Sequence, residues 1–304
     1  MITVLRPLST SELLDRTFHL YRNHFVMFAG ITAITQIPVL TLHVLDAALW
    51  LTALIATRGL RMLLFVAVSL LGLEVAHAAT AVALSRLHLG GSTSIKGAYS
   101  SAKGSLLRVI WIVFVTFLLP MAAAIVLGFI SVGVAATGLD EISGSGFRVA
   151  VIFVVVFLAA PILALRWLLA WSLVVPITVL EGGGLRATIR RSRKLTAGRR
   201  GRILAIYLLI FLLTYAVAVL FQVPYFILVG GRAFSTHPGH QGTLRVMVSA
   251  IGTFLSTSFV GPLLEIAFTL IYYDERVRKE GFDLQLMMLT LEGGTATAVT
   301  VSAS

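Results

Sequence analysis

Long runs of apolar residues constrain this chain more than any other feature of its sequence. Six segments of 20 or more residues contain almost no charged side chain. Coiled as a helix, such a run is long enough to cross a hydrocarbon layer of about 30 Å. Strands with open edges would leave backbone groups unpaired in lipid, so the spans are expected to be helical. The predicted spans cover residues 26–50, 62–84, 106–136, 149–180, 203–229 and 246–273.

The overall composition agrees with a polytopic membrane protein of the all-α class. Hydrophobic residues make up 58% of the 304 residues and charged residues 12%, against about a quarter charged in soluble domains. The net charge of +11 lies at the ends of the apolar runs, where membrane topology explains it, so nucleic acid is not an expected partner. The chain has no cysteine, which excludes disulfides and thiolate metal sites.

A short amphipathic helix is predicted before the first, third and fifth spans, at the membrane interface. The first begins with a capping box formed by Ser9 and Glu12. Each short helix, together with the two spans after it, makes one unit of a threefold internal repeat. We therefore predict one membrane domain over residues 1–286, with repeat units at about 8–88, 92–181 and 184–280, followed by a disordered tail over residues 287–304.

Prolines interrupt the first, third and fifth spans, at Pro38, Pro120 and Pro224. They could mark broken helices of the kind that transporters use, or ordinary kinks, which we favour. Gln36 and Gln222 precede two of these prolines. Their amides could satisfy freed carbonyl groups or bond across helices.

The distribution of positive charge predicts the orientation of the protein. If the N-terminus is cytoplasmic, 18 of the 24 Lys and Arg residues fall on cytoplasmic segments and 5 on outer ones. This excess places both termini in the cytoplasm. Residues 181–202 carry the densest basic cluster, which we interpret as a contact for anionic lipid headgroups or for an acidic membrane-protein partner. Its members are Arg186, Arg190, Arg191, Arg193, Lys194, Arg199, Arg200 and Arg202.

Three glycines, Gly182, Gly183 and Gly184, precede this basic cluster. No Gly-Lys-Ser/Thr sequence follows them and no strand precedes them, so they do not match a phosphate-binding loop. They are predicted to form a hinge that turns a span into a helix lying in the membrane plane.

Three charged residues lie deep within the predicted spans, Glu74, Arg166 and Glu265, and His77 lies one turn from Glu74. Such groups are costly in lipid and are expected to face the bundle interior and to pair. They could line a polar path or ligand pocket, or Arg166 could bridge the glutamates and fix the packing of the repeats. Glu74 and His77 resemble half of a di-iron ligand set, but no second Glu-x-x-His occurs. We therefore expect no metal and no cofactor.

Three segments carry a family resemblance: RPLSTSELLDRTFHLYRNHF, VVPITVLEGGGLRATIRRSRKL and YYDERVRKEGFDL. In this order they resemble a bacterial six-span family known as the membrane domain of glycerophosphoryl diester phosphodiesterases. The resemblance extends to about residue 286 and implies a multi-pass protein of the bacterial inner membrane. Some members are fused to a soluble phosphodiesterase barrel, whose acidic metal-binding pattern is not matched here, so the resemblance implies architecture rather than enzymatic activity.

No serine–histidine–acid arrangement or other catalytic set stands out in the sequence, so we do not expect an enzyme. The first functional hypothesis is a non-enzymatic scaffold or membrane-homeostasis module. The alternative is a carrier for a lipid or small phosphorylated solute, which would use the polar cluster within the membrane.

Overall fold

The computed structural model describes residues 7–47, 58–88, 91–115, 165–230, 241–281 and 288. All regular secondary structure in this part of the chain is helical, as the all-α prediction requires. A helical turn at residues 165–171 precedes α8. The helices are α1 (Thr10–Asn23), α2 (Phe25–Ala47), α4 (Arg58–His88), α5 (Ile95–Val113), α8 (Val174–Glu181), α9 (Leu185–Thr196), α10 (Arg200–Gly230) and α11 (Gln241–Glu280).

Four of the described helices are long and apolar enough to cross a membrane. Their apolar stretches are Phe25–Asp46, Gly59–Leu87, Arg200–Ile227 and Leu244–Glu280. They correspond to the first, second, fifth and sixth predicted spans. The other two predicted spans fall largely on residues 116–164, which lie outside the described residues, so the structure does not test the total of six.

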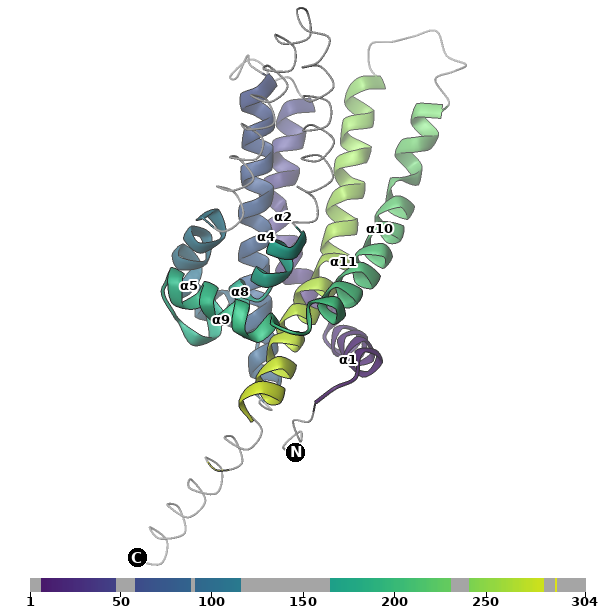
Figure 1. Ribbon diagram of the computed structural model, residues 1–304. Coiled ribbons are helices and arrows are strands. Elements are labelled where there is room, and N and C mark those ends of the chain that lie inside the picture. Colours follow the sequence, from purple (N-terminus) through teal and green to yellow (C-terminus); the bar gives the residue numbers. More distant parts are fainter. Residues whose placement is uncertain are drawn as a thin grey trace, which may run out of the picture.

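The short helices gather at one end of the long ones (Figure 1). We call α1, α5, α8 and α9 the collar. Helices α2 and α10 run away from the collar, and α4 and α11 return towards it (Figure 1). Helix α11 packs against α2, α10, α4 and α1, so it joins the first part of the chain to the last.

The beginnings of the short helices follow local sequence signals. Both halves of the predicted capping box of α1 are present: the Ser9 side chain accepts from the Glu12 N–H, and the Glu12 side chain accepts from the Ser9 N–H. Helix α5 begins after Ser94, whose side chain accepts a hydrogen bond from the N–H of Gly97. These side chains satisfy donors that have no partner within their own helix.

The prolines lie inside continuous helices, at Pro38 in α2 and Pro224 in α10, rather than at helix breaks. Pro120 lies outside the described residues. The amide of Gln222 donates to the carbonyl oxygen of Ser249 at 3.2 Å and to the hydroxyl of Thr253 at 3.0 Å. This glutamine therefore bonds across from α10 to α11, which is one of the two roles considered for it.

Close backbone contact accompanies that bond. A Cβ atom added at Gly252 would lie 2.7 Å from the carbonyl oxygen of Phe221. A Cβ at Gly72 of α4 would similarly lie 2.8 Å from the carbonyl oxygen of Thr35 in α2. Small residues at such positions let membrane helices approach closely.

The replacement Gly252→Ala is expected to push α10 away from α11, because the added methyl group meets backbone atoms that cannot rotate aside. We expect a loss of about 1–2 kcal/mol in unfolding free energy, measured by thermal unfolding of the detergent-solubilised protein. The control is Gly201→Ala in α10, where an added Cβ meets no atom within 4 Å. Equal stability of the two variants would contradict the close approach.

Candidate functional site

The first candidate site lies between α4 and α11, within the apolar stretches. Glu74, His77 and Thr80 follow one another at intervals of three residues on α4, and Glu265 faces them from α11. The Thr80 hydroxyl donates to Oε2 of Glu265 at 2.7 Å. The Glu74 carboxyl group lies near enough to interact electrostatically with Glu265. The ring of His77 stacks on Phe268, with 6.0 Å between centroids.

Several polar atoms of this cluster are buried and have no hydrogen-bond partner among the described residues. They are Oε2 of Glu74, Nε2 of His77 and Oε1 of Glu265; Glu265 as a whole is only 3% exposed. Within the described part of the chain, no three His, Cys, Asp or Glu residues are grouped as metal ligands. The cluster therefore has unused hydrogen-bonding capacity.

Arg166 is not joined to this cluster. It lies on the turn at residues 165–171 with an exposed side chain. Among the described residues there is no ion pair between Arg166 and Glu74 or Glu265. The structure thus brings together three of the four predicted residues of the polar cluster.

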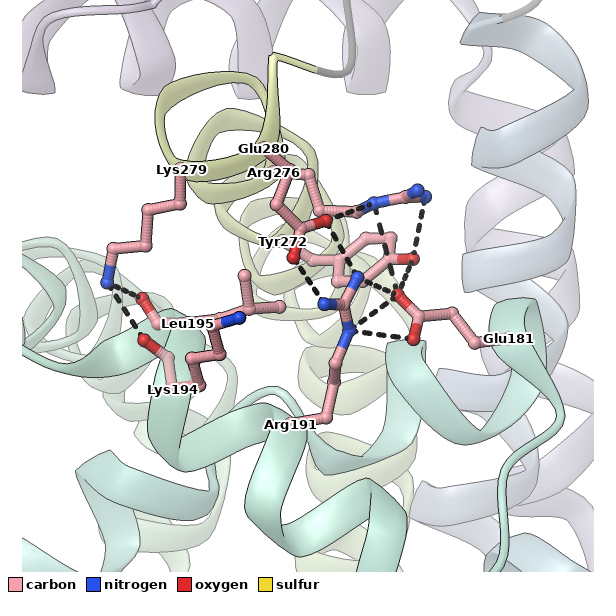
Figure 2. A network of polar contacts seen from close by, with 8 residues as sticks. All are labelled: Glu181, Arg191, Lys194, Leu195, Tyr272, Arg276, Lys279 and Glu280. Carbon is pink, nitrogen blue, oxygen red and sulfur yellow. Dashed lines mark hydrogen bonds and ion pairs between the residues drawn. The ribbon is translucent and has the colours of Figure 1, made fainter. Parts of the chain in front are cut away.

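The second candidate site is an ionic network that joins the collar to the end of α11, with Arg191 of α9 at its centre (Figure 2). Its Nε donates to Oε2 of Glu181 at 2.9 Å, and its Nη2 donates to Oε1 of Glu181 at 3.0 Å and Oε2 of Glu280 at 2.7 Å. The Tyr272 hydroxyl also donates to Glu181, at 2.8 Å. The hydrogen bonds that Arg191 donates to Glu280 and then to Glu181 raise its pKa, so this guanidinium keeps its charge.

Lys279 of α11 holds the end of α9 (Figure 2). Its Nζ donates to the carbonyl oxygens of Lys194 at 3.1 Å, Leu195 at 2.5 Å and Ala197 at 2.7 Å. The last carbonyl groups of a helix have no partner within it, and a cation there is favoured by the helix dipole. Lys279 therefore caps α9 from another helix.

Asp274 forms a second centre, between α11, α10 and the segment before α1. Its side chain is fully buried. Oδ1 accepts from the backbone N–H of Leu8 at 2.7 Å, and Oδ2 accepts from Arg202 at 2.5 Å and Arg278 at 3.0 Å. Both arginines also donate to the carbonyl oxygen of Leu8. One carboxylate thus holds two arginines and the chain entering α1.

Glu275, next in sequence, is fully buried as well and lies among three cations. The distance from a carboxylate oxygen of Glu275 to the side-chain nitrogen is 3.8 Å for Arg199 and 3.7 Å for both Arg202 and Lys279. The end of α11 therefore supplies the carboxylates that neutralise much of the basic segment.

The eight predicted lipid-contact residues divide into two sets by exposure. The half-buried set consists of Arg191, Arg199, Arg200 and Arg202. Three of these, Arg191, Arg199 and Arg202, form the ion pairs described above. The exposed set, which we call the basic face of α9, has the three- and four-residue spacing of one helix face. Its members are Arg186, Arg190, Arg193 and Lys194. The Arg193 guanidinium lies 5.4 Å from the centroid of the Trp171 ring, which orients it.

The three glycines form the turn between α8 and α9. Gly182 ends α8 with a φ of 73°, a left-handed conformation that glycine adopts without strain. Its carbonyl oxygen accepts from Nη1 of Arg108, in α5, at 2.9 Å. Gly184 caps the start of α9 without a side-chain hydrogen bond.

The comparisons with known proteins give one family. Residues 139–292 match the model of the family described as the membrane domain of glycerophosphoryl diester phosphodiesterase. Neither the curated proteins nor the solved structures include a match to this chain.

Proposed function

This chain belongs to the family of the membrane domain of glycerophosphoryl diester phosphodiesterase, and we propose that it acts as a non-enzymatic scaffold of the bacterial inner membrane. Four of its described helices are long and apolar enough to span a membrane, so it is an integral membrane protein. In this proposal the collar is a platform on the cytoplasmic leaflet, and the basic face of α9 contacts anionic headgroups or an acidic membrane-protein partner. The observation that carries the proposal is the division of the basic residues into a half-buried set, three of which are ion-paired, and an exposed face.

The proposed topology has six spans in three units, with both termini in the cytoplasm. The order of the described helices supports it. Helix α1 is followed by α2 and α4, and α9 is followed by α10 and α11. Each of these two series consists of a short helix, a long apolar helix that leaves the collar and a second long helix that returns to it (Figure 1). In this arrangement α1, α5 and α9 lie in the interface.

The buried network supports a rigid platform rather than a loose basic segment. Arg191, Lys279 and Asp274 tie α9, the start of α10 and the segment before α1 to a single helix. A cation near an anionic membrane surface contributes about 1 kcal/mol. Four such cations held at fixed positions make contact with headgroups without ordering a flexible loop first.

Replacing Arg186, Arg190, Arg193 and Lys194 together by glutamine is expected to weaken stabilisation by anionic lipid. The measurement is the shift in melting temperature when phosphatidylglycerol, rather than phosphatidylcholine, is added to the detergent-solubilised protein. We expect the shift seen with the native chain to fall by at least half, roughly in line with four lost charges. A control in which the three arginines become lysine keeps the charge and should keep the shift.

Two results would overturn the proposal. One is an equal phosphatidylglycerol shift in the native and glutamine-substituted proteins. The other is release of glycerol 3-phosphate from a glycerophosphodiester by the purified chain, because that activity would make the protein an enzyme.

A second candidate function, a carrier for a lipid or small phosphorylated solute, is favoured by the polar cluster between α4 and α11. In the part of the chain that the structure describes, Glu74, His77 and Glu265 each have a buried atom without a hydrogen-bond partner. Buried polar groups are normally satisfied, so unpaired ones mark places where a proton, water or ligand group would bind.

The carrier hypothesis is tested with fluorescent phosphatidylglycerol in proteoliposomes, where dithionite bleaches only the outer leaflet. The hypothesis predicts that the lipid exchanges between leaflets faster than in empty liposomes. The faster exchange should be lost in Glu265→Gln and kept in the control Asp15→Asn. Exchange at the same rate as in empty liposomes would contradict the hypothesis that the protein carries a lipid.

A further inference from the structure

The turn before α9 combines several features of an anion site. Helix α9 begins at Leu185. The first backbone N–H that donates to a carbonyl oxygen of the helix start is that of Thr188, which bonds to Gly184 at 2.9 Å. The N–H groups before it point out of the helix end without an acceptor inside it. Gly184 has no side chain with which to cap them, whereas Ser9 and Ser94 cap α1 and α5.

An independent observation is the hydroxyl of Thr188. This residue is 1% exposed, and its Oγ1 has no hydrogen-bond partner among the described residues. Several other buried threonines donate to the carbonyl oxygen four residues earlier, as Thr17 does to Leu13 at 2.8 Å and Thr178 does to Val174 at 2.7 Å. The Thr188 hydroxyl instead faces the turn, because a Cβ atom added at Gly183 would lie 3.3 Å from it.

The charges around the turn are also those of an anion site. Arg108 reaches across from α5 and donates from Nη1 to the carbonyl oxygen of Gly182, which holds its guanidinium beside this turn. Arg186 is exposed in the first turn of α9. The carboxylate that precedes the turn, Glu181, is neutralised by Arg191 and accepts from Tyr272.

We propose that the turn at residues 182–184, the first N–H groups of α9, the Thr188 hydroxyl and the Arg108 guanidinium bind one phosphate group of a phosphate mono- or diester. Backbone N–H groups at a helix start, together with an arginine, form a recurrent phosphate site. Glycine at position 183 places no side chain in front of the Thr188 hydroxyl, where a Cβ atom would lie 3.3 Å from Oγ1. The ester can be a lipid headgroup or a soluble compound, since both present the same group. This inference goes beyond the scaffold proposal, because it assigns a saturable site rather than a charged surface.

The test measures binding to the purified full-length chain in detergent by native mass spectrometry and thermal shift. Three probes are titrated: inorganic phosphate, glycerol 3-phosphate and short-chain phosphatidylglycerol. The variant Thr188→Val removes only the hydroxyl, and we expect its affinity for the phosphate probes to fall about tenfold or more. Because this hydroxyl has no partner among the described residues, the melting temperature of the ligand-free variant should not fall. Gly183→Ala should also weaken binding, by filling the space in front of Oγ1.

The matched control is Thr178→Val, which removes a buried hydroxyl that is already bonded within α8 and should leave affinity unchanged. Saturable binding of phosphatidylglycerol alone identifies a headgroup site, and binding of glycerol 3-phosphate as well identifies a site open to soluble esters; either supports the proposal. Absence of saturable binding for all three probes overturns it, as does unchanged affinity in Thr188→Val or a lower melting temperature of that variant without ligand. Replacing Arg190, Arg193 and Lys194 by glutamine should reduce the melting-temperature shift caused by anionic lipid but keep saturable phosphate binding. This variant therefore separates failure of the phosphate site from failure of the scaffold proposal.

Discussion

Replacing Asp274 with alanine is expected to cost about 3–5 kcal/mol of unfolding free energy, because removing one partner of a buried ion pair leaves the other charge uncompensated. In this protein two arginines, Arg202 and Arg278, lose their common acceptor. The backbone N–H of Leu8 loses its acceptor at the same time. The segment before α1 and the start of α10 are therefore both released from α11.

Thermal unfolding in detergent measures the loss, and limited proteolysis before α1 reports which segment is freed. The control is Asp15→Ala, which removes an exposed carboxylate from α1 and should change stability by less than about 0.5 kcal/mol. If Asp274→Ala melted at the temperature of the native protein, the carboxylate would not be the centre of the contact.

The second large effect is expected from Arg191→Gln, which leaves Glu181 and Glu280 without their shared cation. The side chains of all three residues are between 17% and 26% exposed, so water compensates part of the loss. We expect destabilisation of roughly 2–4 kcal/mol, somewhat below that of a fully buried pair. Arg190→Gln, one residue away on the exposed face, removes the same charge and should be nearly neutral.

A double-mutant cycle separates the ion pair from other effects of this substitution. If Arg191 acts through Glu280, the variant carrying both Arg191→Gln and Glu280→Gln should lose less stability than the sum of the single variants. Additive losses would show that the two side chains do not stabilise each other.

The membrane class and the helix beginnings could be predicted from sequence because they depend on local signals. Apolar runs identified the four spans that the structure describes, and Ser9 with Glu12 identified the cap of α1. The contact between α4 and α11 also followed in part, since intramembrane carboxylates must face protein. The position of Arg166 did not follow, because charge alone does not say which helix a long side chain meets.

The ionic network was missed because its partners are far apart in the chain. Leu8 and Asp274 are 266 positions apart, and no local pattern joins them. The spacing of four between Asp274 and Arg278 was a readable signal of paired charge on one helix. Helical spacing from Arg186 would likewise have placed Arg191 off the basic face, although counting charges treated all eight basic residues alike.

The bond between Leu8 and Asp274 also sets an order of events during synthesis. The ribosome makes the chain from its N-terminus, so α1 exists long before the carboxylate that holds it. Until residue 274 has been made, the backbone of Leu8 has no Asp274 to bind and Arg202 has no Asp274 to pair with. The bonds that join the segment before α1 and the start of α10 to Asp274 can therefore form only after most of α11 has been made.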